Sequence, residues 1–179
     1  MKRAIIFSAH STELLLKERL RRVHPAFVWE TVEKYPSLEA RSVTVDTVVA
    51  RLKSICGVTF SASDESNLRS LRMTRNAIEH HEWKTTEKEA KVIIGSALSF
   101  AFSFANEHLK VDLAEAFKKN DTWLQLLSEL WEFAQAHTER LEAKLRGVPT
   151  LDCNQCGASL VTLDGTCELC GHWQDIDDT

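Results

Sequence analysis

Four of the five cysteines lie within eighteen residues near the C-terminus, and their spacing restricts how that end of the chain can fold. They form two C-x2-C pairs, Cys153 with Cys156 and Cys167 with Cys170, separated by ten residues. In a reducing compartment, pairs at this spacing indicate a metal site rather than disulfides. Four thiolates fill the tetrahedral shell of zinc and leave no open position, so we expect a structural zinc ion. Iron is the alternative metal.

The residues around the cysteines predict a small metal-bound module. Each pair is followed by a glycine, Gly157 or Gly171, and resembles a zinc knuckle, in which backbone N–H groups bond the thiolates. Between the pairs, the segment ASLVTLDGTC is typical of two strands joined by a turn at Asp164-Gly165. We therefore expect residues 150–179 to form a zinc ribbon with a short β-hairpin and an acidic tail.

The rest of the chain has the pattern of a helical bundle. Only three prolines and six glycines interrupt 179 residues, and apolar residues recur at helical spacing up to Leu145. Gly147 and Pro149 then end the pattern. The prediction is an all-α protein with a helical domain at residues 1–146, a linker at 147–149 and the zinc ribbon at 150–179.

Local signals predict where several helices begin and end. Thr86 and Glu89 match a capping box that opens an apolar helix running through Leu109. Gly57 is expected to close the preceding pattern VDTVVARLKSIC. A short helical piece is expected at 26–35, and one long helix at 123–145.

Neither a membrane span nor a secretory signal is expected. The longest apolar run, 92–105, is shorter than the roughly 20 residues that cross a bilayer and contains a glycine and three serines. The N-terminal apolar patch is too short for a signal peptide. We expect a cytoplasmic protein whose apolar run is a buried helix.

Charge divides unevenly along the chain. The net charge is −4, yet the residues from Gly147 onward carry six acids and no Lys or Arg, which leaves residues 1–146 at +2. Contact with nucleic acid is therefore expected from the helical body. For the zinc ribbon, contact with a protein partner or with the body is favoured over RNA.

One stretch of the helical body concentrates reactive side chains. The sequence RNAIEHHEW, at 75–83, places an arginine, an amide and a histidine at Arg75, Asn76 and His80. This arrangement resembles the ribonuclease motif R-[N/D/H]-x3-H of the HEPN superfamily. The opening helix AHSTELLLKERL is also similar to the first helix of that family, with Glu13 and Lys17 in an E-x3-K arrangement.

The resemblance implies a metal-independent endoribonuclease, of the kind found among toxins and antiphage defence effectors. Such cleavage uses the 2′-hydroxyl as nucleophile, and a histidine, with an ordinary pKa of about 6.5, can act as base or acid. In this reading Arg75 holds the phosphate, His80 transfers protons and Asn76 orients them. Members of the family build one composite site from two copies, so a homodimer acting on RNA is expected.

Several neighbouring residues have two readings. Arg75 and His80 point roughly 140° apart on an ideal helix, so a single straight helix does not bring them together well. A long arginine side chain that wraps round, a helix that ends near His80, or a second copy that supplies another Arg75 and His80 would ease this. His81 is a possible supporting group, whereas a salt bridge from Arg75 to Glu79 with His80 and His81 at the surface is the ordinary alternative. Glu13 and Lys17 are spaced equally well for a simple ion pair.

Two further points narrow the function. Arg69 and Arg72 recur with Arg75 every three residues and are candidates to line an RNA path, or to form a solvated face. Glu82 stands where one toxin subfamily has a tyrosine that its antitoxin modifies, so control by such a modification is not expected.

The alternative function is a non-catalytic HEPN-like adaptor that binds a nucleotide or a partner protein, with the zinc ribbon as its interaction module.

Overall fold

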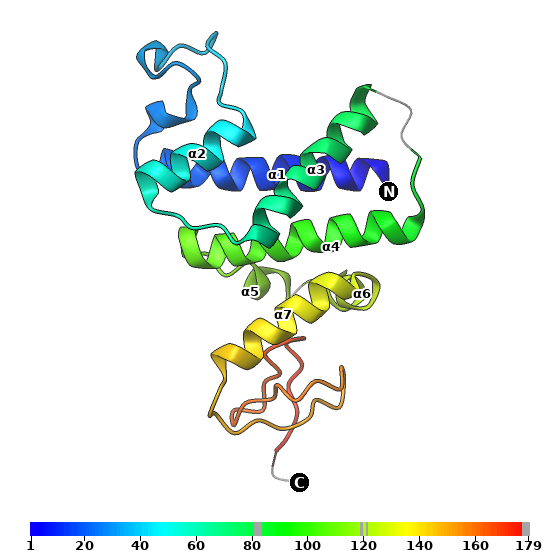
Figure 1. Cartoon of the computed structure of the whole chain (residues 1–179). Helices are drawn as coiled ribbons and strands as arrows, with labels where there is room; N and C mark the ends of the chain where they lie inside the picture. Colours follow the sequence, from blue (N-terminus) through cyan, green and yellow to red (C-terminus); the bar gives the residue numbers. More distant parts are fainter. Residues whose placement is uncertain (81–83, 119, 121, 177–179) are drawn as a thin grey trace. The chain divides into compact units, whose positions relative to one another are not determined.

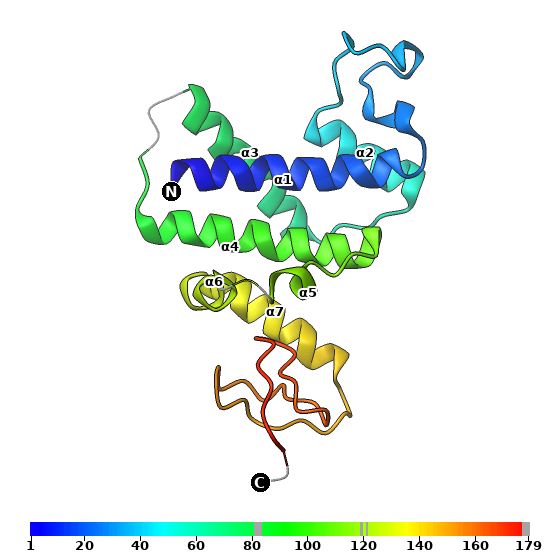
Figure 2. The ribbon, with the colours of Figure 1, turned by 180° about the vertical axis from the view of Figure 1, so that it is seen from behind.

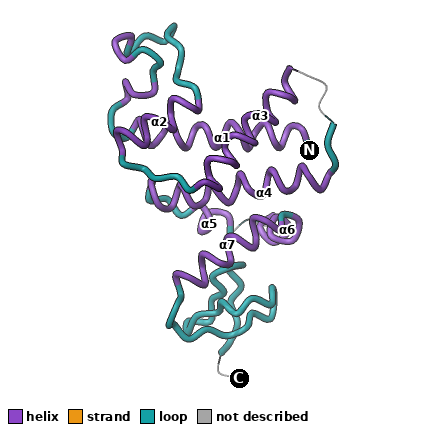
Figure 3. The backbone as a smooth tube through the Cα atoms, viewed as in Figure 1, coloured by secondary structure: helices purple, strands orange, loops and turns teal. Residues whose placement is uncertain are grey.

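The computed structural model describes residues 1–80, 84–118, 120 and 122–176. These residues form seven α-helices and no β-strand (Figure 3), which confirms the all-α prediction at the level of fold class. The chain divides into two compact units, Met1–Asp112 and Leu113–Thr179. The linker predicted at 147–149 falls inside the second of these units, in which helices after Leu113 pack with the cysteine residues.

The first unit is built around its N-terminal helix (Figure 1). It contains α1 (Lys2–Arg21), η1 (Pro25–Val28), η2 (Val32–Lys34), α2 (Val45–Cys56), α3 (Ala62–His80), α4 (Glu87–Phe104) and η3 (Ala105–Leu109). Helix α1 contacts α2, α3 and α4. Its buried residues recur every three or four positions, which gives one apolar face: Ile5, Ala9, Thr12, Leu16 and Leu20.

Helix α4 lies beside α1 and begins as the sequence predicted (Figure 2). The Glu89 N–H donates to Thr86 Oγ1 at 3.2 Å and the Thr86 N–H donates to Glu89 Oε2 at 2.9 Å, which completes the capping box. Of the described helices, Glu87–Leu109 is long and apolar enough to cross a membrane by length and composition. Half of its most apolar window is buried inside the protein, as in a core helix of a soluble protein.

The connection from α1 to α2 differs from the expected short helix. It forms the two 3-10 turns η1 and η2, and Trp29 pairs with Ser42 in an isolated β-bridge. Arg51 of α2 holds this connecting segment against α2, because its guanidinium donates hydrogen bonds to the carbonyl oxygens of Phe27 and Trp29, both at 2.6 Å. At the C-terminal end of α2, Gly57 adopts a φ of +64° and closes the helix, as predicted.

An ion-pair cluster near the C-terminal end of α1 should make the free energy of unfolding depend on pH in the acidic range. Glu18 Oε2 accepts from Arg21 Nε at 2.6 Å, and Glu18 Oε1 accepts from Arg22 Nε at 3.0 Å. The hydrogen bonds from Arg21, then from Arg22, lower the pKa of Glu18 to about 2 from its ordinary 4.5. Because the folded-state pKa is depressed, this stabilisation is complete above about pH 4.5 and is lost as the pH falls toward 2.

Replacing Glu18→Gln should therefore lower the free energy of unfolding by at most about 1 kcal/mol at pH 7, since the pair is partly exposed to solvent. The difference between the variant and the wild type should shrink at pH 3, and urea unfolding at the two pH values measures it. An equal difference at both pH values would mean that the Glu18 charge is not the cause.

The second unit combines three helices with the cysteine segment, defined here as residues 150–176. The helices are α5 (Leu113–Phe117), α6 (Thr122–Glu129) and α7 (Trp131–Lys144). The single helix expected at 123–145 is interrupted at Leu130, whose φ of −114° and ψ of 76° are not helical. The sequence did not reveal this break because apolar residues continue at helical spacing through it.

The cysteine segment is a set of turns with isolated bridges. A turn forms at Asp164-Gly165, where Gly165 has a φ of +83° and its N–H donates to the Thr162 carbonyl at 2.8 Å. Leu151 bridges Val161, and Val161 bridges Cys167. Within the described part of this segment, these bridges stand where the sequence predicted the strands of a β-hairpin.

Candidate functional site

The four C-terminal cysteines converge on one point. Cys153 Sγ lies 3.6 Å from Cys170 Sγ, and Cys156 Sγ lies 3.7 Å from Cys167 Sγ. All four sulfur atoms lie within 4.8 Å of one another. Four thiolates bound to zinc at about 2.3 Å would be about 3.8 Å apart at tetrahedral geometry. The predicted ligands are therefore brought together at the spacing that one tetrahedral metal ion requires.

Two equivalent backbone turns produce this geometry. The Gly157 N–H donates to the Cys153 carbonyl at 2.8 Å, and the Gly171 N–H donates to the Cys167 carbonyl at 2.8 Å. Both glycines have a left-handed φ, +75° and +76°, which a side chain would disfavour. The spacing C-x2-C-G thus folds each pair so that both of its thiols face the same side.

The thiols have unequal tendencies to ionise. Burial disfavours the Cys153 thiolate, but the backbone N–H groups of Cys156 and Gln155 outweigh that effect and lower its pKa to about 7. Burial raises the pKa of Cys156 to about 11, and it also raises the pKa of Cys170. A cation among the sulfur atoms would favour four thiolates, because it supplies the positive charge that the buried anions lack.

Helix residues of the second unit pack against and hydrogen-bond to the segment that carries the four cysteines. Trp123 of α6 is fully buried and donates from Nε1 to the carbonyl oxygen of Leu169 at 2.9 Å. Leu141 of α7 packs in one apolar cluster with Leu160 and Val161 and with the buried cysteines. The cysteine segment therefore shares its core with α6 and α7.

The second candidate site is a narrow groove between α1 and α3 in the first unit. Glu13 of α1 and Arg75 of α3 line it together, although they are 62 positions apart in the sequence. Lys17 Nζ lies 2.5 Å from Glu13 Oε1 and also donates to Ser42 Oγ at 2.9 Å. Glu13 of the E-x3-K pair and the motif arginine thus line one groove. Glu13 and Lys17 also form the ordinary ion pair that their spacing allows.

The three motif residues do not converge within one chain. Arg75 Nε lies 3.0 Å from Glu79 Oε2, which is the local ion pair considered as the ordinary alternative. Asn76 and His80 are exposed and make no hydrogen bond or ion pair with the described residues. Positions 76 and 80 share one face of α3, whereas Arg75 faces α1. His81 and Glu82 lie outside the described residues.

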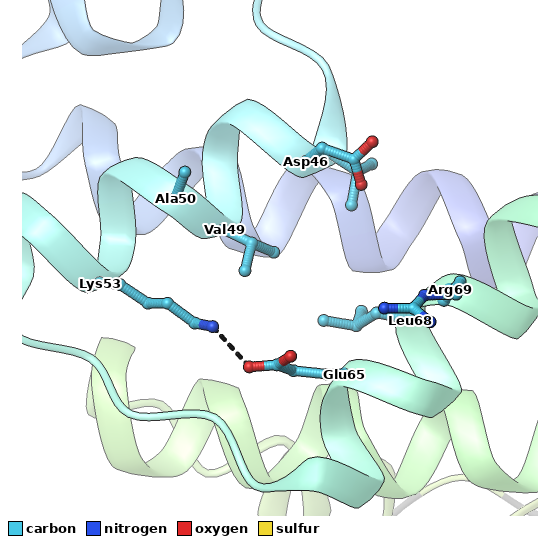
Figure 4. Close-up of a pocket in the computed structure, with 8 residues that line it drawn as sticks. Asp46, Val49, Ala50, Lys53, Glu65, Leu68 and Arg69 are labelled. Atoms are coloured by element: carbon cyan, nitrogen blue, oxygen red, sulfur yellow. Dashed lines mark hydrogen bonds and ion pairs between the residues drawn. The ribbon is translucent and has the colours of Figure 1, made fainter.

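Two arginines of the expected row on α3, Arg72 and Arg75, form ion pairs with acids. A second groove, between α2 and α3, has a cavity volume of about 280 Å³ and is lined by Arg69, Glu65 and Lys53 (Figure 4). Lys53 Nζ lies 2.5 Å from Glu65 Oε1, and the Lys53 hydrogen bond lowers the pKa of Glu65. Arg72 forms an ion pair with Asp46. Acids from α2 and α3 therefore offset the positive charge expected along this helix.

Two partners of the candidate site residues Arg72 and Lys17 were missed from the sequence. Asp46 pairs with Arg72 across 26 positions, and Ser42 accepts from Lys17 across 25 positions. No local spacing rule links residues so far apart, and both residues have ordinary local roles near a helix start.

We found no match between this chain and the protein-family models, the curated proteins or the solved structures compared with it.

Proposed function

We propose that the protein is a HEPN-type endoribonuclease that cuts RNA without a catalytic metal and acts as a cytoplasmic homodimer, in the role of a toxin or antiphage defence effector. One observation carries the proposal: Glu13 of α1, which forms an ion pair with Lys17, lines the same groove as Arg75. The resemblance to the family links these two sequence motifs, and one residue of each, Glu13 and Arg75, lines this groove.

The side chains fit the chemistry of metal-independent cleavage. The reaction needs a group that takes the 2′-hydroxyl proton, a cation for the phosphorane and an acid for the leaving 5′-oxygen. Arg75 offers a permanently charged, planar fork for phosphate oxygens. His80 at the exposed end of α3 can exchange protons with a substrate, and Asn76 is placed one turn before it.

A homodimer would supply what one chain does not. Asn76 and His80 share an exposed face of α3 with Arg69 and Met73, because these positions recur every three or four residues. Two copies of this face packed about a two-fold axis would bring the Asn76 and His80 side chains of both copies together. The proposed composite site combines these two faces with Arg75 of each copy, which would have to turn from its groove toward the shared face.

For the four cysteines we propose structural zinc. The close sulfur spacing and the all-thiolate donor set suit a closed tetrahedral shell, and Cys153, Cys156, Cys167 and Cys170 would hold the ion. Its chemistry there is to fix the fold of the cysteine segment. The exposed Leu163 and Trp173 on this segment make it a suitable surface for a protein partner.

An RNA-cleavage assay tests the enzymatic proposal. Purified protein should cut labelled RNA in buffer containing EDTA, with bound metal measured in the same sample. Arg75→Ala and His80→Ala should each reduce the rate by about 100-fold or more, since each removes a group that acts in the transition state. Light scattering should show a dimer at micromolar concentration.

Matched controls make this assay decisive. Arg19→Ala and His10→Ala remove the same side-chain types from α1 positions outside the groove, and cleavage should persist in both. Cleavage that survives Arg75→Ala and His80→Ala would point to a contaminating nuclease.

The alternative function is a non-catalytic HEPN-like adaptor that binds a nucleotide or a protein. The ion pairs Arg75–Glu79 and Arg72–Asp46 favour it, because they leave little free positive charge on α3 for RNA. Absence of cleavage in the wild type under all conditions, together with a monomeric state, would support the adaptor over the enzyme.

A further inference from the structure

A carboxylate of the same helix holds Arg75. Its Nε lies 3.0 Å from Oε2 of Glu79, one turn further along α3, and the two side chains are 30% and 27% exposed. We infer that Glu79 occupies the position of an RNA phosphate on Arg75 and that incoming RNA must displace it. This inference rests on the proposed function, because it concerns the arginine assigned to the phosphate.

Arg75 and Glu79 lie close enough for an ion pair but do not form an aligned hydrogen bond. The Arg75 Nε atom is buried and has no hydrogen-bond partner among the described residues, so the 3.0 Å approach is an ion pair without hydrogen-bond alignment. A buried donor without an acceptor is unfavourable. A phosphate oxygen can accept from a guanidinium with better geometry, since the planar fork matches two phosphate oxygens. Exchange of the carboxylate for phosphate would therefore gain a hydrogen bond.

The acid that lines the groove beside Arg75 is already paired. Glu13 lines the same groove, but its Oε1 lies 2.5 Å from Lys17 Nζ, which neutralises it. The neighbouring Arg72 is paired with Asp46 from α2. Glu79 is thus the carboxylate in the described part of the first unit that pairs with Arg75.

Removing this carboxylate should strengthen RNA binding. Glu79→Gln keeps the size of the side chain, removes the competitor for Arg75 and removes a negative charge that would repel the phosphate. The expected change is an affinity for RNA about threefold to tenfold higher than that of the wild type.

Fluorescence anisotropy with a labelled, fully 2′-O-methylated RNA measures binding without cleavage, because this RNA lacks the nucleophile. The matched control is Glu87→Gln, which removes the same charge from an i,i+4 pair on α4 whose Lys91 Nζ to Glu87 Oε1 distance is also 3.0 Å. Glu79→Gln should bind more tightly, and Glu87→Gln should bind like the wild type.

A double variant shows whether the effect passes through Arg75. The gain from Glu79→Gln should disappear in Arg75→Ala/Glu79→Gln compared with Arg75→Ala. A gain that persists without Arg75, equal gains from both glutamine variants, or binding by Glu79→Gln that is no tighter than the wild type would each overturn the inference.

Cleavage of unmodified RNA by the same proteins separates this inference from the proposed function. Tighter binding by Glu79→Gln supports the inference even if the wild type does not cut RNA, a result that removes the nuclease assignment alone. If the wild type cuts and Glu79→Gln lowers kcat without lowering KM, Glu79 is instead a positioning residue for Arg75, and the inference fails while the nuclease assignment survives.

Discussion

Cys153→Ser should abolish stoichiometric metal binding and unfold the second unit of the protein. Cys153 is buried, and its Sγ lies 3.6 Å from Cys170 Sγ, so a hydroxyl there removes one of four converging sulfur ligands. Structural zinc binding in small folds contributes apparent free energies of about 10 kcal/mol or more, which exceeds what so small a core supplies. Mass spectrometry of the native protein should find one zinc per wild-type chain and none per variant chain.

The loss of structure should be confined to one part of the molecule. Hydrogen exchange in Cys153→Ser should rise throughout the cysteine segment and in α6 and α7, whose core residues it shares. The matched control is Cys56→Ser, because Cys56 lies at the end of α2 and outside the four-cysteine cluster. A native metal content and exchange pattern in Cys153→Ser would show that the cluster does not depend on a metal.

Trp123→Ala should be the most damaging single substitution among the helices of the second unit. The indole is 1% exposed, crosses the rings of Phe133 and His137 edge-on at 5.8 Å and donates to the Leu169 carbonyl at 2.9 Å. Truncation of a buried tryptophan leaves a large cavity and costs about 3–5 kcal/mol. Since Leu169 precedes Cys170, one of the four proposed zinc ligands, the variant should also release its metal to a chelator faster than the wild type does.

Two further variants divide this effect into its parts. Trp123→Phe retains an aromatic ring but leaves the Leu169 carbonyl without its indole donor, and it should cost about 1–3 kcal/mol. Trp131→Ala removes the same side chain from α7 where it is 69% exposed, so its effect should stay within about 0.5 kcal/mol. Guanidinium unfolding followed by far-UV circular dichroism measures all three, and equal costs for Trp123→Ala and Trp131→Ala would contradict this account of the core.

These predictions depend differently on sequence and structure. The spacing of the four cysteines was enough to predict that their side chains come together, because each C-x2-C-G turn is closed by hydrogen bonds within four residues. The partner of Trp123 was not predictable, since the Leu169 carbonyl is a backbone group 46 positions away. The position of Arg75 on α3 followed from helical periodicity, but its groove partner Glu13 followed only from the packing of α1 against α3.

The α3 motif illustrates the limit of local reasoning about a site. Helix geometry alone predicts that Arg75 and His80 diverge, and the structure has Arg75 at the groove and His80 exposed. The sequence also offered Glu79 as an ion-pair partner, and that pair is present. What the sequence did not indicate is the charge balance around the motif, because Asp46 approaches Arg72 from another helix.

The sequence by itself determined the features that are closed within a few residues: the all-α character, the capping box at Thr86, the left-handed Gly57 and the two cysteine turns. Tertiary structure alone decided the unit boundary after Asp112, the break at Leu130 and the isolated bridges in place of a hairpin. The physical reason is how far apart in the sequence the interacting residues lie. Capping, periodicity and glycine turns act between neighbours along the chain, whereas unit boundaries, ion pairs between helices and strand pairing depend on which distant surfaces are buried together.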